Sequence, residues 1–190
     1  IFNSPAGLDL AFDIFRKDST FLNINFNIGA QYAFSATQSA KLFLRRLQTI
    51  ATPNTSSVLA FRQLPPEADV SSTDIGIDYE INKTDYRLNP LRGVEFRMIS
   101  SVGIKKIKKN NLILELKDPS DPAFNFDKLY DTLKLKTYRL NFNLSAARYF
   151  PLGRQSTLRT AFSGGLFQSG NIFRNELFQI GGYKLLRGFD

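Results

Sequence analysis

Apolar and polar residues alternate one by one over long stretches of this chain, and this period of two constrains its fold more than any other feature. The clearest run is 22–32, where Leu22, Ile24, Phe26 and Ile28 alternate with asparagine and glycine residues. Successive side chains of a β-strand point to opposite faces of the sheet, so the pattern predicts a strand with one apolar and one polar face. Its eleven residues exceed the usual length of a globular strand and suit a tilted membrane strand of ~9–11 residues.

The alternation predicts seven antiparallel strands, each beside the next in sequence, and no helix. They cover 8–14, 22–32, 40–48, 75–81, 94–102, 138–148 and 158–166. Even-numbered positions of the second, fifth, sixth and seventh strands, and odd-numbered positions of the fourth, are expected to share the apolar, lipid-facing side. Asn23, Asn25 and Asn27 are expected on the opposite side.

The connections differ in length in a regular way. Short ones near 35–39, 83–92 and 151–156 alternate with long ones at 49–73, 104–132 and 168–190, and only the first hairpin at 17–19 departs from this order. Short turns at one end and long loops at the other are typical of bacterial outer-membrane barrels. A soluble antiparallel sandwich, with one solvated sheet face, is the alternative. The polar positions, mostly Asn, Asp, Arg, Ser and Gly, favour the barrel.

Composition narrows the possible chemistry. The chain has no Cys and no His, which excludes disulfides, thiolate or imidazole metal sites and His- or Cys-based catalysis within these 190 residues. We expect no enzyme activity, no cofactor and no nucleic acid partner, since the basic residues (net charge +8) do not cluster with aromatic residues. Mean hydropathy is −0.20, and alternating strands give such neutral averages.

Two segments carry a resemblance to a family. After the long alternating region, Phe178-Gln179-Ile180-Gly181-Gly182 precedes a hydrophobic-Arg-Gly-aromatic tetrad. The tetrad is Leu186, Arg187, Gly188 and Phe189. This segment resembles a loop of the BamA/TamA superfamily of outer-membrane insertases and transporters. Its residue pattern looks like that of the Bacteroidetes members. Upstream, the turn with Asn89, Pro90, Arg92 and Gly93 and the Pro151-Leu152-Gly153 turn resemble further elements of that family.

The resemblance implies an all-β fold, an antiparallel transmembrane β-barrel of which this chain supplies a part, about seven strands of roughly sixteen. Residues 1–168 would form the strands, with short periplasmic turns and longer extracellular loops, and 169–190 would be a Gly-rich loop that folds into the lumen. In the family the loop's arginine contacts an acidic site on a later strand. Arg187 takes that role here, with its carboxylate partner outside this chain. An odd number of strands cannot close such a barrel, so we expect an interior fragment of a larger one.

The implied function is insertion, assembly or translocation of proteins at the outer membrane of a Gram-negative bacterium. Family members work without a cofactor, by pairing an exposed strand edge with an incoming client strand. The partners would be outer-membrane lipids and lipopolysaccharide, unfolded outer-membrane protein clients and accessory assembly proteins. A passive outer-membrane channel and the barrel of a fused enzyme of the same superfamily are the alternatives.

Three other groups of residues have weaker interpretations. Lys105, Lys106, Lys108 and Lys109 could contact lipopolysaccharide phosphates or form a solvated loop face. Tyr32, Phe34, Tyr79, Tyr138 and Phe150, near strand ends, suit interfacial aromatic girdles or core packing. Asp9, Asp13, Asp78 and Glu80 are expected as scattered carboxylates on the polar side.

Overall fold

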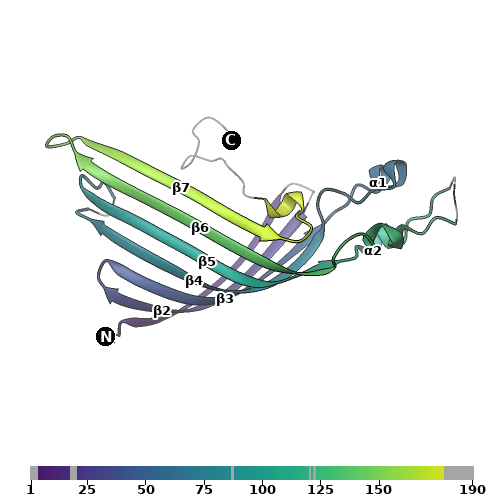
Figure 1. Cartoon of the computed structure of the whole chain (residues 1–190), viewed down its shortest axis with the longest axis horizontal. Helices are drawn as coiled ribbons and strands as arrows, with labels where there is room; N and C mark the ends of the chain where they lie inside the picture. The colour runs from purple at the N-terminus through teal and green to yellow at the C-terminus, as the bar shows by residue number, and fades with distance from the viewer. Residues whose placement is uncertain (1–3, 18–20, 87, 120, 122, 178–190) are drawn as a thin grey trace.

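Seven antiparallel strands lie side by side in sequence order and form one sheet in the computed structural model of the chain (Figure 1). The structure describes residues 4–17, 21–86, 88–119, 121 and 123–177. The strands are β1 (Ala6–Lys17), β2 (Phe21–Ser35), β3 (Gln38–Ala51), β4 (Asp69–Thr84), β5 (Gly93–Lys108), β6 (Lys136–Pro151) and β7 (Thr157–Ser169). All seven predicted strands are therefore confirmed in number, order and direction, but each is longer than expected.

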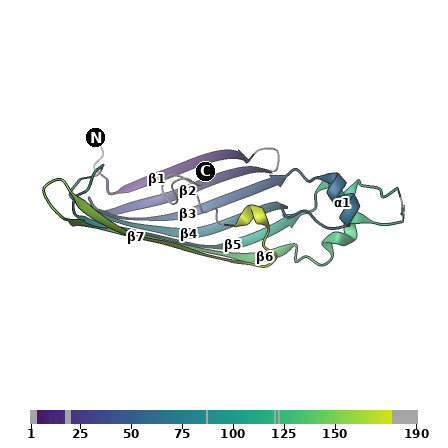
Figure 2. The ribbon, with the colours of Figure 1, turned by 90° about the horizontal axis from the view of Figure 1, so that it is seen from above.

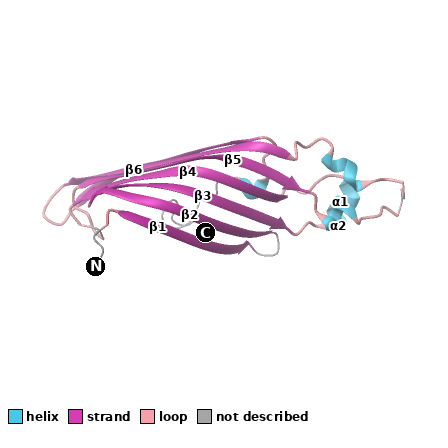
Figure 3. Ribbon diagram, turned by 90° about the horizontal axis from the view of Figure 1, so that it is seen from below, coloured by secondary structure: helices cyan, strands magenta, loops and turns pink. Residues whose placement is uncertain are grey.

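The two ends of the sheet differ, as the connection lengths predicted. At one end, here called the turn end, 36–37, 85–92 and 152–156 connect neighbouring strands closely. At the other, the loop end, 52–68 and 109–135 extend well beyond the strands (Figures 1 and 3). The predicted loop 49–73 was too long at both ends, because β3 continues to Ala51 and β4 begins at Asp69. The predicted loop 104–132 began and ended too early, because β5 continues to Lys108 and β6 begins only at Lys136.

The prediction of no helix was wrong. Short helices lie in the connections: α1 (Thr55–Phe61), α2 (Asn111–Leu114) and the 3-10 helices η1 (Phe126–Tyr130) and η2 (Arg174–Glu176). Asn54, Asn110 and Asn125 cap the first three, each through a side-chain oxygen that accepts a backbone N–H. No helix of the described residues is long and apolar enough to cross a membrane.

The strand register keeps apolar and polar positions on separate faces across the whole sheet. Directly paired residues of neighbouring strands lie on the same face. One row of such pairs runs Leu10, Ile28, Leu44, Ile75, Val102, Leu140 and Gln168. The next row runs Ala11, Asn27, Arg45, Asp74, Gly103, Arg139 and Ser169. We call the side of the first row the apolar face and that of the second the polar face.

This division confirms which positions share a face. Even-numbered residues of β2, β5, β6 and β7 and odd-numbered residues of β4 lie together on the apolar face, and Asn23, Asn25 and Asn27 lie on the polar one. A shift of one residue in any pairing would move charged side chains to the apolar face, so the register is strongly specified.

The sheet is curved into an open trough, and η2 lies inside it (Figures 1 and 2). The polar face lines the concave side, where Phe43, Asp74 and Ser101 are buried. The apolar face is convex and uncovered by any described segment: Ile77, in the central strand, is 50% exposed and Phe162 is 62% exposed. Tyr32, Phe34, Tyr138 and Phe150 are exposed as well.

A small hydrophobic core joins the loops at the loop end. Val58 of α1, Ile113 of α2 and Phe126 and Tyr130 of η1 form one buried cluster. Arg62, which ends α1 in a left-handed conformation, donates to Asp118 at 2.6 Å. The loops 52–68 and 109–135 thus pack on each other as one unit beyond the loop end of the sheet (Figure 3).

Candidate functional site

A row of charged side chains crosses the polar face toward its loop end. Arg45, Asp74, Gly103 and Arg139 follow one another on β3, β4, β5 and β6. Gly103 is required here, because a Cβ at this position would lie 2.3 Å from Asp74 Oδ1. The missing side chain leaves room for Asp74 Oδ2 to lie 3.9 Å from Arg139 Nη1. Asp74 is 2% exposed and also accepts a hydrogen bond from Ser72 at 3.2 Å.

A second charged group lies nearer the turn end and is centred on Asp78. Arg97 donates to both oxygens of Asp78, through Nε at 3.0 Å and Nη2 at 2.7 Å. Lys41 lies between Asp78 and Asp9, at 3.9 and 2.6 Å. The aliphatic part of Lys41 crosses Gly29, where a Cβ would meet it at 3.1 Å. Asp9 and Asp78, which sequence reasoning treated as scattered, therefore share one lysine.

These contacts show what the polar face can do chemically. The two-pronged contact of Arg97 with Asp78 holds both side chains in position. Within the described residues, no three His, Cys, Asp or Glu side chains gather as metal ligands. The charges form a fixed polar lining, which suits contact with a polar chain or with water and ions.

The segment 170–177, which follows β7, is fastened to the polar face by a buried ion pair. Lys105 of β5 is 0% exposed, and its Nζ contacts Glu176 Oε2. The side chain of Glu176 is itself only 4% exposed. The same ammonium donates to the carbonyl oxygen of Asn171 at 2.7 Å and lies 5.3 Å from the ring centre of Phe173. Glu176 also accepts the backbone N–H of Phe173 at 3.1 Å. A buried ammonium group has lost its hydration, so it needs partners such as this carboxylate and this carbonyl oxygen to remain charged.

Backbone contacts tie the same segment to two further parts of the chain. The N–H of Arg174 donates to the Pro66 carbonyl at 2.9 Å, and the Asn175 amide donates to the Ala68 carbonyl at 3.0 Å. Gly170 N–H donates to Thr137 Oγ1 at 3.3 Å. The segment thus joins β5, the start of β6 and the 52–68 loop, and we call 170–177 the anchored segment.

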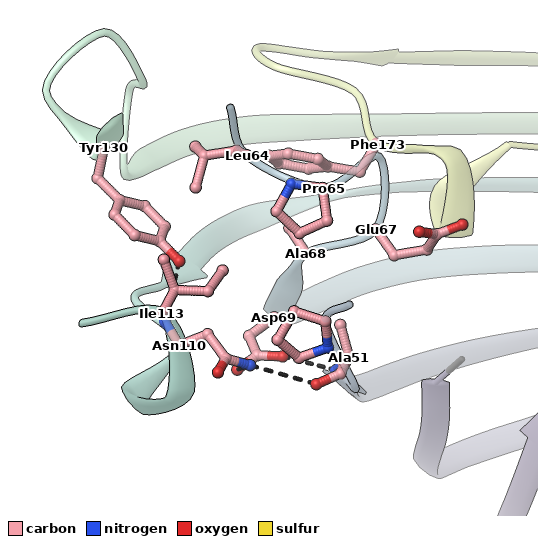
Figure 4. A pocket seen from close by; sticks show the side chains of 11 residues that line it. Ala51, Leu64, Pro65, Glu67, Ala68, Asp69, Asn110, Ile113, Tyr130 and Phe173 are labelled. Carbon is pink, nitrogen blue, oxygen red and sulfur yellow. Dashed lines mark hydrogen bonds between the residues drawn. The ribbon is translucent and has the colours of Figure 1, made fainter. Parts of the chain in front are cut away.

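Phe173 of the anchored segment also lines a small pocket where the loops meet the strand ends (Figure 4). Its polar edge is already satisfied: Asp69 accepts from Ala51 N–H at 2.6 Å and from the Asn110 side chain at 3.0 Å. Tyr130 accepts the Asn110 N–H at 3.1 Å, and burial raises the pKa of its hydroxyl. The pocket is therefore a packed junction of three loop segments.

The turn motif of the sequence forms an organised turn between β4 and β5. Gly93 has a φ of +130°, and a Cβ there would lie 2.2 Å from the Lys83 carbonyl oxygen, so only glycine fits. Asn89 and Arg92 are exposed and Pro90 is partly exposed. Arg92 Nε lies 4.0 Å from Asp85 Oδ2, at the limit of an ion pair.

Asp85, which sequence reasoning did not select, is the residue that organises this turn. Its Oδ1 accepts backbone N–H groups of Tyr86, Leu91 and Arg92 at 3.0, 3.0 and 3.2 Å. Desolvation acts to raise the pKa of the Asp85 carboxyl, but these hydrogen bonds outweigh it and hold the pKa below its ordinary value. An Asp at the start of a turn was the available signal.

The loop motif lies outside the described residues: Gly181, Gly182, Leu186, Arg187, Gly188 and Phe189. The structure places only the residues that lead into it, and these lie on the polar face.

The four lysines of the run 105–109 do not share one surface, because the strand register places them on different sides of the sheet. Lys105 points to the polar face and is buried, and Lys109 pairs with Asp127 of η1. Only Lys106 and Lys108 remain on the outer side, so treating the run as one surface was wrong.

Comparison of the chain with known protein families, with curated proteins and with solved structures found no match.

Proposed function

We propose that these seven strands form part of the wall of a transmembrane β-barrel in the outer membrane of a Gram-negative bacterium. One observation carries this proposal. The middle of the uncovered convex face is mainly apolar and its charged residues lie toward the two ends of the strands, whereas charged groups run across the concave face. In water such a sheet would expose its largest apolar surface, a surface that soluble proteins cover. In a bilayer the same surface faces lipid, and the polar face lines the interior.

The length of the apolar face supports the proposal. On β5 the outward positions run from Val94 to Ile104, ten steps that span roughly 33 Å along the strand. With a strand tilt of about 40°, this corresponds to about 25 Å along the membrane normal, the height of the apolar band of outer-membrane barrels. On β6, Tyr138 pairs with Ile104 at one end of this band, and Phe150 lies one outward position beyond Arg148, the partner of Val94, at the other. Interfacial aromatic residues are common at such positions.

The edges of the sheet define what else the barrel needs. β1 and β7 each pair with one neighbour in the described structure, and an unpaired edge is costly in lipid. Further strands, from a longer chain or from another copy, would close the wall. A barrel of about sixteen strands accommodates these seven.

Within this barrel we propose a role in inserting, assembling or translocating proteins, as in the BamA/TamA superfamily. The proposal rests on the loop with Gly181, Gly182 and the Leu186–Phe189 tetrad, together with the anchored segment that starts this loop inside the trough. Clients would be unfolded outer-membrane proteins, recognised through strand pairing at a barrel edge without a cofactor. Outer-membrane lipids, lipopolysaccharide and accessory assembly proteins would be the other partners.

The membrane part is tested with two arginine substitutions in the full-length protein. Ile77→Arg places a charge at the middle of the apolar face, where it should lower barrel stability by about 2–4 kcal/mol. Ser163→Arg, at an exposed position of the polar face, is the matched control and should have little effect. Resistance to SDS without boiling gives the folded fraction. Equal losses in both variants, or a detergent-free soluble monomer, would contradict the proposal.

The functional part is tested at Arg187. Arg187→Ala should reduce client insertion while the barrel persists, and Arg187→Lys should restore activity poorly because lysine lacks the planar fork of donors. Client assembly is measured at matched amounts of folded barrel. Full activity in both variants would remove the main support for protein insertion. It would favour a passive channel, for which the charged lining of the polar face is also suitable.

A further inference from the structure

Four cations lie on the outer side of the sheet at its loop end. Lys106 on β5 and Lys136 on β6 are directly paired across the two strands. Arg46 on β3 and Lys108 on β5 are on the same apolar face, and all four side chains are exposed. We call Arg46, Lys106, Lys108 and Lys136 the basic belt.

The basic belt is poorly neutralised by the described part of the chain. None of the ion pairs found there involves Arg46, Lys106 or Lys136. Lys108 is opposite Asp69 and is attracted to its carboxylate, although no direct ion pair joins them, so it is the member of the belt with an anion nearby. Like charges directly opposite each other destabilise a sheet, so the Lys106–Lys136 pair calls for an anion beside it.

The height of the basic belt identifies where that anion would be. On β5, Ile104 is the last apolar outward residue, and Lys106 follows at the next outward position, roughly 6–7 Å further along the strand. Headgroups occupy about 5–8 Å on each side of the hydrocarbon core. On β6, Lys136 follows Tyr138 in the same way. Lys106, Lys108 and Lys136 therefore lie at headgroup depth, just beyond the apolar band, and Arg46, in the same row as Ile104, lies at its edge.

We propose that the basic belt binds the phosphate groups of the phosphorylated glycolipid that forms the outer leaflet. This inference rests on the proposed membrane barrel, with the loop end facing outward. Lys106 and Lys136 are directly paired on adjacent strands, close enough for both to donate to one phosphate. Lys108 is the next outward residue on β5, and Arg46 lies two strands away, level with Ile104. Charge-assisted hydrogen bonds to phosphate are the strong kind, and they would relieve the repulsion between the paired lysines.

The turn end of the same face provides a matched control. Lys83 and Arg148 are outward, exposed and joined in register through Val94. Arg148 lies over the Phe150 ring at 4.9 Å. In the proposed orientation these two cations face the inner leaflet, which lacks the glycolipid, so they should contribute little to its binding.

The experiment compares three forms of the full-length protein in detergent by native mass spectrometry with added diphosphorylated lipid A. They are the natural sequence, Lys106→Gln/Lys136→Gln and Lys83→Gln/Arg148→Gln. Each cation near an anionic surface contributes about fivefold in affinity, so removing the belt pair should weaken lipid A binding about 25-fold. The turn-end pair should leave it unchanged. Dephosphorylated lipid A should bind the natural protein as weakly as diphosphorylated lipid A binds the belt variant.

Each other result overturns the inference. An equal loss in both double variants would mean a general effect of net charge, and no loss in either would mean that the belt has no phosphate partner. If phosphatidylglycerol bound as tightly as lipid A, the belt would recognise anionic lipids in general and not the glycolipid. Flotation with phosphatidylcholine vesicles separates the two proposals: a protein that stays out of the vesicles contradicts the barrel, whereas a protein that enters them with an inert belt contradicts only this inference.

Discussion

Replacing Glu176 with Gln removes the negative charge that faces the buried ammonium group of Lys105. The amide keeps the size of the side chain and one oxygen acceptor, and Lys105 keeps its bond to the Asn171 carbonyl at 2.7 Å. The loss should therefore be that of one charge-assisted hydrogen bond, about 1.5–3 kcal/mol. Lys105→Met leaves the Glu176 carboxylate, 4% exposed, without its cation and should cost about 3–5 kcal/mol.

The relevant quantity is the free energy of opening of the anchored segment, because the strands themselves keep their pairing. Hydrogen exchange of the backbone amides of Gly170, Phe173 and Arg174, each bonded in the structure, measures it in the full-length protein. Since about 1.4 kcal/mol corresponds to a factor of ten, Glu176→Gln should raise exchange at these amides about 10- to 100-fold. The double variant Lys105→Met/Glu176→Gln should recover part of the loss, because it leaves no unpaired buried charge.

Arg97→Gln is the matched control. It breaks an ion pair on the same face and the same strand, eight residues from Lys105 and so roughly 26 Å away. Exchange in the anchored segment should not respond to it. The reasoning fails if Glu176→Gln leaves all three amides unchanged, or if the two single losses simply add in the double variant, since additivity would mean that the two side chains do not interact.

Three further results are expected from the turn and from the polar face. Gly93→Ala should destabilise the turn by about 1–3 kcal/mol, since the backbone of Gly93 has positive φ and a Cβ there would clash. Gly153→Ala should be neutral, because a Cβ there would meet nothing within 4 Å. The temperature at which each variant loses its SDS resistance compares the two. Because hydrogen bonds lower the pKa of Asp85, its stabilisation is complete above the unfolded-state value of about 3.9 and is lost as pH falls through the lower folded value. The protection factors of the turn amides, which correct for the intrinsic pH dependence of exchange, should therefore fall only in strong acid, and a fall near pH 7 would contradict this. Gly103→Ala should disrupt the Asp74 row, because a Cβ would lie 2.2 Å from the Thr73 carbonyl oxygen, and its SDS-resistant fraction should fall.

The strands were predictable because their signal is local. Alternation within β2 or β7 needs only the nearest neighbours in sequence, and the register follows once the apolar positions must share a face. Strand ends were less accurate: β4 begins at Asp69, but Ser71 and Ser72 place polar side chains on both faces and hide the alternation. α1 was missed because it is seven residues long and lies between prolines, although Asn54 before Ser57 was a capping signal.

The charged contacts of the polar face could not be predicted from the sequence. Lys105 and Glu176 are 71 residues apart, and nothing in either segment indicates the other. Their meeting depends on how the sheet curves and on where the chain after β7 turns back. Asp9 and Asp78 share Lys41 only because β2 places Gly29 between β1 and β3. The register, once known, would have placed these three side chains on one face, but not at hydrogen-bonding distance.

The strand order also bears on how this sheet can assemble. Every strand pairs with its immediate neighbours in the sequence, so each new pair is completed by closing a hairpin rather than by bringing distant parts of the chain together. Closing a short connection costs little chain entropy, and even the longest one adds only about 2.3 kcal/mol over the shortest by the logarithmic dependence on loop length. Pairing can therefore spread from any hairpin in either direction. Inserting or deleting a whole hairpin would leave the remaining pairs in register, whereas losing a single strand would reverse the direction of every strand that follows.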